Sequence, residues 1–406
     1  MNVPKLRFKE FTGEWKEKSF RDIVSLNLVP TEKPSSDYVR LGIRSHCKGT
    51  FHEIVKIENV LEADKIFLVP KDNLILNITF AWEHAIAITD ENDEGKYVSG
   101  RFPTFSFKSE ELPAFYESII RSKRMKYELG VASPGGAGRN RVLNKELFLD
   151  IPVNTTNIEE QTKISNFIRC VDDKIKNQKD IIESLEKQKK GLMQKIFSQE
   201  LRFKDEDGKE FPAWEEKKLG EVGVLKNGIA KGKEFFGTGK KFINLQDVFG
   251  KTKLYFNDYG LVEVTDKELE ENNLRKGDVL FVRSSVKPEG VGLSCVVMED
   301  LLDTVFSGFI IRCRFSDTSI IDINYSTYCF LESNFRTELL KKSSSSANTN
   351  INQDNLANLR FKLPCIKEQQ KIAEILSALD AKIELENQKL EHWQQIKKGL
   401  LQQMFV

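Results

Sequence analysis

The sequence has 406 residues, 40% of them hydrophobic and 30% charged, with a formal net charge of +1. This length allows two or three domains with their own cores, and no run approaches the roughly 18 apolar residues that a membrane-spanning helix needs. The near-zero charge argues against a non-specific nucleic-acid binder, although basic residues gathered on one face would still allow sequence reading. No signal-like segment follows Met1, so we expect a cytoplasmic protein. The six scattered cysteines form no C-x-x-C pair and are expected to be buried thiols.

In chain order, the first half is expected to be a mixed α/β domain of many short strands, and the second half repeats that plan. Apolar runs of strand length follow turn signals, and a helical stretch comes after the last strand of each half. The expected strands are 74–78, 85–89 and 105–107 in the first half and 278–282, 295–298 and 309–315 in the second, with helices at 112–128 and 323–341.

The same segment follows each of these two domains. Residues 158–197 and 366–405 are identical at 15 of 40 positions, without a gap. The halves also open alike, because Trp15 and Trp214 each follow a Leu-Arg-Phe tripeptide. The chain therefore reads as one unit of about 200 residues written twice.

Both repeated segments carry an a/d heptad pattern in which steps of four and three alternate. A stripe this narrow favours pairing of the two helices with each other over separate packing of each helix on its own domain. An antiparallel, pseudo-twofold pair is expected, about 60 Å long at 1.5 Å per residue. Polar residues interrupt the pattern at equivalent places, Gln178 and Glu386, and Lys189 and Lys397. The expected seam consists of Ile164, Ile168, Val171, Ile175, Ile182, Leu185, Leu192, Ile372, Leu376, Leu379, Ile383, Leu390, Trp393 and Leu400.

The predicted fold class is therefore α+β, with two mixed α/β domains separated by two long helices that pair as an antiparallel coiled coil. The expected boundaries are 1–157 for the first domain, 158–198 for the first helix, 199–365 for the second domain and 366–406 for the second helix.

Motifs for catalysis are not found in the sequence. There is no P-loop, no G-x-S-x-G nucleophile elbow, no H-E-x-x-H zinc motif and no Asp-Pro-Pro-Tyr motif of amino-methylating enzymes. The four histidines form no Cys/His ligand cluster. We therefore expect neither catalytic residues nor a metal site in this chain.

Polar and basic clusters fit DNA reading better. Segments 137–141 and 343–350 occupy corresponding places in the two halves, and both are small and rich in hydrogen-bond donors. Arginine can bind guanine through two hydrogen bonds and asparagine can bind adenine, while a solvated loop is the alternative at every position. Trp82 could stack on a base, or could belong to the core. The candidate DNA-binding residues are Arg40, Arg44, His46, Lys48, Arg139, Asn140, Arg141, Lys226, Lys231, Lys233, Arg283, Ser284, Lys287, Ser345, Asn348 and Asn350.

Shared motifs at the helix ends point to a family. Glu160-Gln161 and Glu368-Gln369 stand near the helix starts, and Lys-Lys-Gly-Leu stands near both helix ends, at 189–192 and 397–400. Together with the Lys-Gly-Asp-Val-Leu strand at 276–280, these motifs resemble the type I restriction–modification specificity subunit. The resemblance extends over the whole chain, including the order of its parts.

This resemblance implies that each domain is a target recognition domain that reads one half of a bipartite double-stranded DNA target, while the paired helices set the unread spacer. It also implies a partnership with two methyltransferase (modification) subunits, which methylate adenine with S-adenosylmethionine. Restriction subunits that translocate DNA with ATP and Mg²⁺ can join them. The cofactors would then sit on partner subunits, and this chain would bind none.

Two alternatives to this interpretation remain. The chain could be a coiled-coil adaptor that binds proteins and does not read DNA. It could also be a fused restriction–modification enzyme, although the motif search leaves no room for a catalytic domain.

Overall fold

The computed structural model describes residues 3–59, 65–135, 141–345 and 348–405. The chain divides into two compact units, unit 1 with residues 1–179 and 388–406, and unit 2 with residues 180–387. Each unit thus combines one globular region with one end of each long helix.

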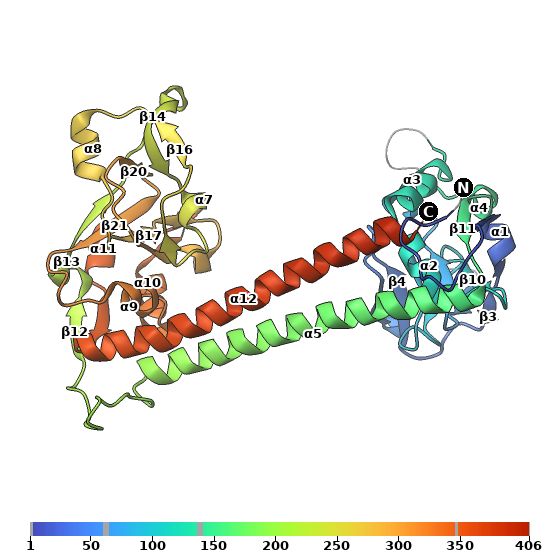
Figure 1. The fold of residues 1–406 in the computed structure, drawn as a ribbon, viewed down its shortest axis with the longest axis horizontal. Helices are drawn as coiled ribbons and strands as arrows, with labels where there is room; N and C mark the ends of the chain where they lie inside the picture. Colours follow the sequence, from blue (N-terminus) through green and yellow to red (C-terminus); the bar gives the residue numbers. More distant parts are fainter. Residues whose placement is uncertain (1–2, 60–64, 136–140, 346–347, 406) are drawn as a thin grey trace. The chain divides into compact units, whose positions relative to one another are not determined.

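Unit 1 is built on two sheets and one two-stranded ribbon (Figure 1). Strand β7 lies inside the four-stranded sheet and is buried along its whole length, as its continuous apolar run predicts. The ribbon joins the start of the globular region to the residues just before the first long helix. The four-stranded sheet consists, in order, of β2 (Val24–Leu26), β10 (Thr104–Phe107), β7 (Asn73–Leu76) and β8 (Ile86–Ile88). The five-stranded sheet consists of β3 (Val29–Thr31), β6 (Ile66–Leu68), β9 (Tyr97–Ser99), β4 (Tyr38–Ile43) and β5 (Thr50–Val55). The ribbon pairs β1 (Lys16–Ser19) with β11 (Pro152–Thr155).

Unit 2 repeats this plan around the fully buried strand β17. A ribbon again leads into a long helix, and a larger main sheet takes the place of the four-stranded one. The main sheet is β13 (Gly223–Asn227), β21 (Ile310–Phe315), β17 (Val279–Val282), β19 (Ser294–Val297) and β15 (Lys253–Leu254). One smaller sheet consists of β16 (Gly260–Val262), β14 (Phe236–Ile243) and β20 (Thr304–Phe306). The other consists of β18 (Ser284–Ser285), β23 (Thr349–Asn350) and β22 (Ser344–Ser345). The ribbon pairs β12 (Glu215–Lys218) with β24 (Arg360–Leu363).

Each helix expected after the last strand of a half is in fact two helices. The continuous helices predicted at 112–128 and 323–341 are wrong in the same way, because an N-cap interrupts each of them. The Ser122 side chain accepts a hydrogen bond from the Met125 N–H, and the Glu332 carboxylate accepts one from the Asn334 N–H. The helices are α2 (Pro113–Ile120) and α3 (Lys123–Val131) in unit 1, and α9 (Ile323–Cys329) and α10 (Ser333–Lys342) in unit 2.

Shorter helices complete both units. They are α1 (Phe20–Ile23), η1 (Ile57–Asn59), η2 (Ala81–Glu83) and α4 (Lys145–Leu149) in unit 1, and α6 (Leu219–Val222), η3 (Lys233–Phe235), α7 (Leu245–Val248), α8 (Asp266–Asn272), η4 (Pro288–Gly290) and α11 (Gln353–Ala357) in unit 2.

The two long helices, α5 (Ile158–Phe197) and α12 (Ile366–Met404), lie side by side and run in opposite directions (Figure 1). In unit 1 the Lys397 ammonium contacts the Asp172 carboxylate, and in unit 2 Lys189 contacts Asp380. The 208-residue offset converts one ion pair into the other. The predicted antiparallel coiled coil is confirmed, and the lysines that interrupt its seam are the residues that join the two helices.

At the helix ends, some of the predicted seam residues pack into the cores of the globular regions. On α5 the a and d positions Val171 and Ile182 are buried between the helices. The first turns, however, contribute to the cores of the globular regions, with Ile164 and Ile168 in unit 1 and Ile372 in unit 2. The helices therefore pack both on each other and on their domains, because the same apolar stripe serves both contacts.

The cysteine prediction is only partly right. Cys170 is exposed on α5 and Cys365 is half-buried, whereas the other four thiols are buried and all six are free. Cys170 precedes the seam residue Val171 and lies about 100° from it around the helix, and its exposure places it outside the buried seam. Among the helices in the described part of the chain, none has the length and apolar character that crossing a membrane requires.

A buried glutamate fixes the start of each long helix to its domain. In unit 1, Arg7 donates to the two Glu160 oxygens at 2.7 and 2.8 Å. In unit 2, Arg202 donates to the Glu368 oxygens at 3.1 and 2.7 Å, and the Trp214 indole donates to the same carboxylate at 2.8 Å. Both glutamates are 0% exposed. Burial alone would raise the pKa of Glu160, but the hydrogen bonds from its partners outweigh it and lower that pKa.

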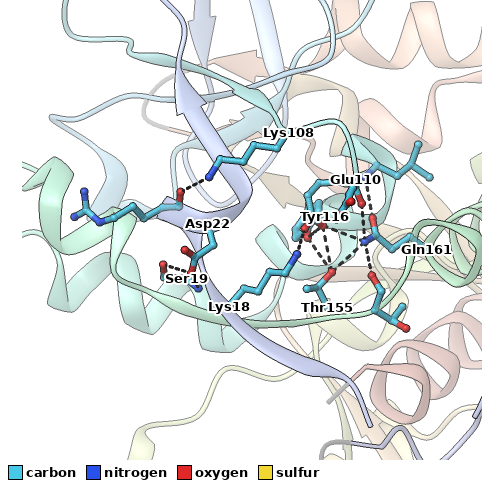
Figure 2. A network of polar contacts seen from close by, with 12 residues as sticks. Lys18, Ser19, Asp22, Lys108, Glu110, Tyr116, Thr155 and Gln161 are labelled. Carbon is cyan, nitrogen blue, oxygen red and sulfur yellow. Dashed lines mark hydrogen bonds and ion pairs between the residues drawn. The ribbon is translucent and has the colours of Figure 1, made fainter. Parts of the chain in front are cut away.

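The adjacent glutamine completes this attachment. Figure 2 shows Gln161 inside a network with Tyr116 and Thr155. Its amide donates to the Thr155 hydroxyl at 3.1 Å and to the Glu111 carboxylate at 3.0 Å, and its oxygen accepts the Leu112 N–H at 2.8 Å. We call the buried Glu160-Gln161 and Glu368-Gln369 dipeptides, with their partners, the helix anchors.

We expect Glu160→Ala to lower the free energy of unfolding of unit 1 by about 3 kcal/mol, because it leaves the Arg7 guanidinium without its buried partner. Urea unfolding followed by tryptophan fluorescence measures this loss. Glu159→Ala is the matched control, since Glu159 is exposed, and its effect should stay within about 0.5 kcal/mol. Equal losses in the two variants would contradict the anchoring role.

Candidate nucleic-acid interface

In unit 2 the fold brings predicted DNA-binding residues together from two distant segments. Strand β18 begins at Ser284 and pairs with Asn350 in β23, which in turn pairs with β22, the strand that contains Ser345. The Ile351 N–H donates to the Arg283 carbonyl at 3.0 Å. Residues 283–287, 344–345 and 348–350 therefore form one surface of unit 2.

Exposure divides the residues of this surface into two groups. Ser284 is only 8% exposed, so its hydroxyl lies beneath the surface. Asn350 is half-buried and donates to the Asn348 carbonyl at 3.0 Å, and Asn348 is exposed. Lys287 is exposed beside Val286, which is 80% exposed. Lys287 and Val286 are thus the side chains of this surface most available to a ligand.

Sequence reasoning missed two apolar members of this surface, Val286 and Phe309. Phe309 is 58% exposed, and its carbonyl accepts the Arg283 N–H at 2.8 Å. The Arg283 guanidinium also donates to the Gly308 carbonyl at 3.2 Å. Exposed apolar groups beside cations can contact thymine methyl groups. The repeat of Ser-Gly at 99–100 and 307–308 was the available signal for the position of Phe309.

The remaining predicted lysines of unit 2 lie on strand β13, on the loop that follows it and on η3. Lys226 is ion-paired with Glu271 at 2.8 Å and Lys231 with Glu268 at 2.7 Å, whereas Lys233 is exposed in η3. Their loop is continuous with the first surface, because residues 228 and 229 form backbone hydrogen bonds with 306, 308 and 310. Lys233 is therefore more available to phosphates than the two paired lysines.

In unit 1, three predicted residues lie in the turn between β4 and β5. Arg44, His46 and Lys48 are exposed, and His46 has a positive φ of 63°. Cys47 is buried beneath the turn, its thiol 3.4 Å from the Ile86 carbonyl, and burial raises the pKa of that thiol. The buried Cys47 thus holds the turn against the domain, and the exposed side chains of the turn are basic.

Two other arginines of unit 1 are already engaged by protein groups. Arg40 pairs with Glu53 at 2.5 Å. The Arg141 guanidinium donates to the Ser133 carbonyl at 3.0 Å, near the end of α3, and lies over the half-buried Trp82 ring at 5.7 Å. Arg141 therefore caps a helix end. Arg139 and Asn140 lie outside the described residues.

Backbone hydrogen bonds show that the surfaces of the two units are equivalent. The Leu143 N–H donates to the Ile78 carbonyl at 2.9 Å in unit 1, as Ile351 does to Arg283 in unit 2. The Ile78 N–H donates to the Arg101 carbonyl at 3.0 Å. In unit 2 the equivalent acceptor is the Phe309 carbonyl, which accepts the Arg283 N–H. Arg101 is exposed and is a further candidate contact that this comparison adds. One scaffold thus presents unlike side chains in the two units.

Groups of three or more metal-ligating side chains that could hold an ion do not occur among the described residues. What the two surfaces offer is hydrogen-bond donors, cations and small apolar contacts. Two similarly built domains with unlike polar surfaces, each packed on part of both long helices within its own unit, are typical of a protein that reads two different sites.

Comparison with known proteins shows that the chain is similar to type I specificity subunits. Residues 213–394 match the family model of the type I restriction modification DNA specificity domain. The type I restriction enzyme MjaVIII specificity subunit of Methanocaldococcus jannaschii is 24% identical over 375 residues, 90% of this chain and 83% of that relative. The resemblance to type I specificity subunits that the helix motifs predicted is confirmed.

Solved structures agree in fold. A chain from a type I R-M system structure, 16% identical, superposes with a TM-score of 0.60 over 95% of this chain and 96% of its own length. The type I restriction–modification S subunit of M. genitalium, 14% identical, gives a TM-score of 0.54 over 100% and 99% of the two chains.

Proposed function

We propose that this chain is the DNA sequence-specificity subunit of a type I restriction–modification system. The observation that carries the proposal is the duplicated recognition domain, with equivalent scaffolds and different exposed side chains. Each unit would read one half of a bipartite double-stranded target, since the surface of each is complete within that unit. The half-sites should differ, because unit 1 presents Arg101 at the position where unit 2 presents Phe309.

The partners follow from the same proposal. Two methyltransferase subunits would bind this chain and methylate adenine with S-adenosylmethionine, and restriction subunits would add DNA translocation with ATP and Mg²⁺. The chain would itself be non-catalytic and cytoplasmic, with all cofactors on its partners. This division of labour is consistent with a sequence that lacks catalytic motifs.

Non-specific affinity should be weak for the subunit alone. Its net charge is +1, and several surface lysines are ion-paired. Phosphate contacts from the assembled complex would then supply most of the salt-dependent affinity, while the two recognition surfaces supply the sequence preference. Binding assays should therefore use the subunit together with its methyltransferase.

In the assembled complex, we expect Lys287→Ala to weaken binding to all DNA sequences alike and to reduce the slope of log K against log salt by about one, as loss of one phosphate contact does. Fluorescence anisotropy across a salt series measures both. Lys276→Ala is the matched control, because Lys276 is exposed at the opposite end of strand β17. If Lys276→Ala reduced the slope of log K against log salt and Lys287→Ala did not, the DNA-binding surface would lie at the opposite end of β17.

The helices should set the spacer between the half-sites. Removal of residues 179–185 and 384–390, one heptad from each helix between the two ion pairs, shortens the pair by about 10 Å. We expect the tolerated spacer to shorten by about three base pairs, or the complex to fail to assemble. Full activity on the original spacer would count against the helices as a ruler. Alanine substitutions in the same heptads control for surface changes at constant length.

The most direct test is a genome-wide map of methylated adenine in cells with and without this gene, with the methyltransferase intact. Methylation should disappear at one split, asymmetric motif, because target choice resides in this chain. An unchanged map with an active methyltransferase would favour a protein-binding adaptor instead.

A further inference from the structure

An apolar groove lies in unit 1 beside the C-terminal end of α12. Its volume is 690 Å³, and it is formed by the corner between α2 and α3, by β11 and by both long helices. Hydrocarbon side chains make up most of its surface, among them Ile119, Met125, Ile175, Leu401 and Phe405.

The corresponding place in unit 2 can be identified from the helix anchors. Gln161 accepts the N–H of Leu112, the N-cap of α2, and Gln369 accepts the N–H of Asp322, the N-cap of α9. Ser118 in α2 and Tyr328 in α9 each lie six positions after these N-cap residues.

Aromatic contacts support the same correspondence. Three positions after the N-cap, Phe115 in α2 lies 5.4 Å from the Phe405 ring near the end of α12. Its counterpart Tyr325 in α9 lies 6.1 Å from the Phe197 ring at the end of α5. Ser118 and Tyr328 are therefore equivalent positions on equivalent helices.

Tyr328 joins α9 to both long helices in unit 2. Its hydroxyl donates to the Asp380 carboxylate at 2.7 Å and lies 3.0 Å from the Ser377 hydroxyl. The Lys189 ammonium lies over its ring at 5.4 Å. The ring thus covers the Lys189–Asp380 ion pair, and burial raises the pKa of its hydroxyl.

Unit 1 has the same ion pair, Lys397 with Asp172, but no such ring over it among its described residues. Ser118 lines the groove instead, and its short side chain leaves the apolar walls open. A serine in place of a tyrosine is thus one difference between equivalent helices that leaves this part of the groove open in unit 1.

Charge around the groove is strongly biased. Five basic residues and one acidic residue, Glu128, line it. The Lys397 charge is partly compensated by Asp172, and Arg121 lies 3.9 Å from Glu117. An acidic ligand is favoured by such a rim. The basic residues are Arg121, Lys123, Arg124, Lys397 and Lys398.

We propose that this groove docks an acidic peptide segment of a protein partner, with one tyrosine side chain entering beside Ser118 as Tyr328 does in unit 2. The hydroxyl of that tyrosine would donate to Asp172, and flanking carboxylates would meet the basic rim. Aromatic anchors in apolar pockets carry much of the affinity of protein interfaces. Since Tyr328 fills the equivalent place in unit 2, only one such segment binds per chain, even when the partner is present twice.

A labelled peptide tests this directly on the full chain. The probe is a short fluorescein-labelled peptide of glutamate and alanine around one central tyrosine, and binding is followed by anisotropy. Replacing the peptide's tyrosine by alanine should weaken binding about tenfold or more. Ser118→Tyr should abolish binding because it fills the groove, while Ser118→Ala, the matched control, should bind like the parent.

A second variant keeps the test independent of folding. Lys398→Glu reverses an exposed charge on the rim of the groove and should weaken binding of the acidic peptide several-fold. Undiminished binding by Ser118→Tyr or Lys398→Glu, equal binding of the tyrosine-free peptide, or no binding to the parent chain would each overturn the proposal. Methylation of the target motif, measured in the same variants, reports DNA reading separately, so failure of one proposal is distinguishable from failure of the other.

Discussion

At the start of α5 and of α12, a buried glutamate and its neighbouring glutamine hold the helix against the domain that precedes it. The carboxylate binds an arginine from the first residues of the half, and the glutamine binds the backbone at the start of α2 or α9. One dipeptide therefore fixes three segments: the opening strand region, the middle helices and the long helix. Removal of either partner would leave a buried polar group unsatisfied, which explains why these residues reappear unchanged in both halves while most surface residues do not.

The two halves show which parts of the scaffold must match and which can differ. The ion pairs between helices, the aromatic contacts at the helix ends and the backbone hydrogen bonds beneath each candidate surface all recur. The exposed side chains above those hydrogen bonds do not, as Arg101 and Phe309 illustrate. A rigid frame that carries variable loops separates stability from specificity, so the chain can present two different surfaces without two different folds. Ser118 and Tyr328 show that such divergence also reaches the helix side of the domain.

The sequence predicted the features that depend on periodicity and repetition. The heptads predicted the helix pair and its direction, and the apolar runs predicted β7 and β17. Local capping was harder to read: the breaks at Ser122 and Glu332 depend on single side-chain hydrogen bonds within otherwise helical stretches. The candidate surface of unit 2 was predictable only in part. Its members come from segments about 60 residues apart that the β18–β23 pairing joins, and side-chain availability follows from packing, which buries Ser284 and exposes Phe309.

The way the chain threads through the units also constrains how it folds. Unit 2 is one continuous stretch, residues 180–387, whereas unit 1 needs residues 388–406 from the far end of the chain. Phe405 packs on Trp15 and Phe115, and the Leu6 N–H donates to the Gln403 carbonyl at 2.9 Å. During synthesis from the N-terminus, the globular region of unit 1 therefore emerges before that of unit 2 but is completed after it, because its core stays partly uncovered until the segment that contains Phe405 has been made.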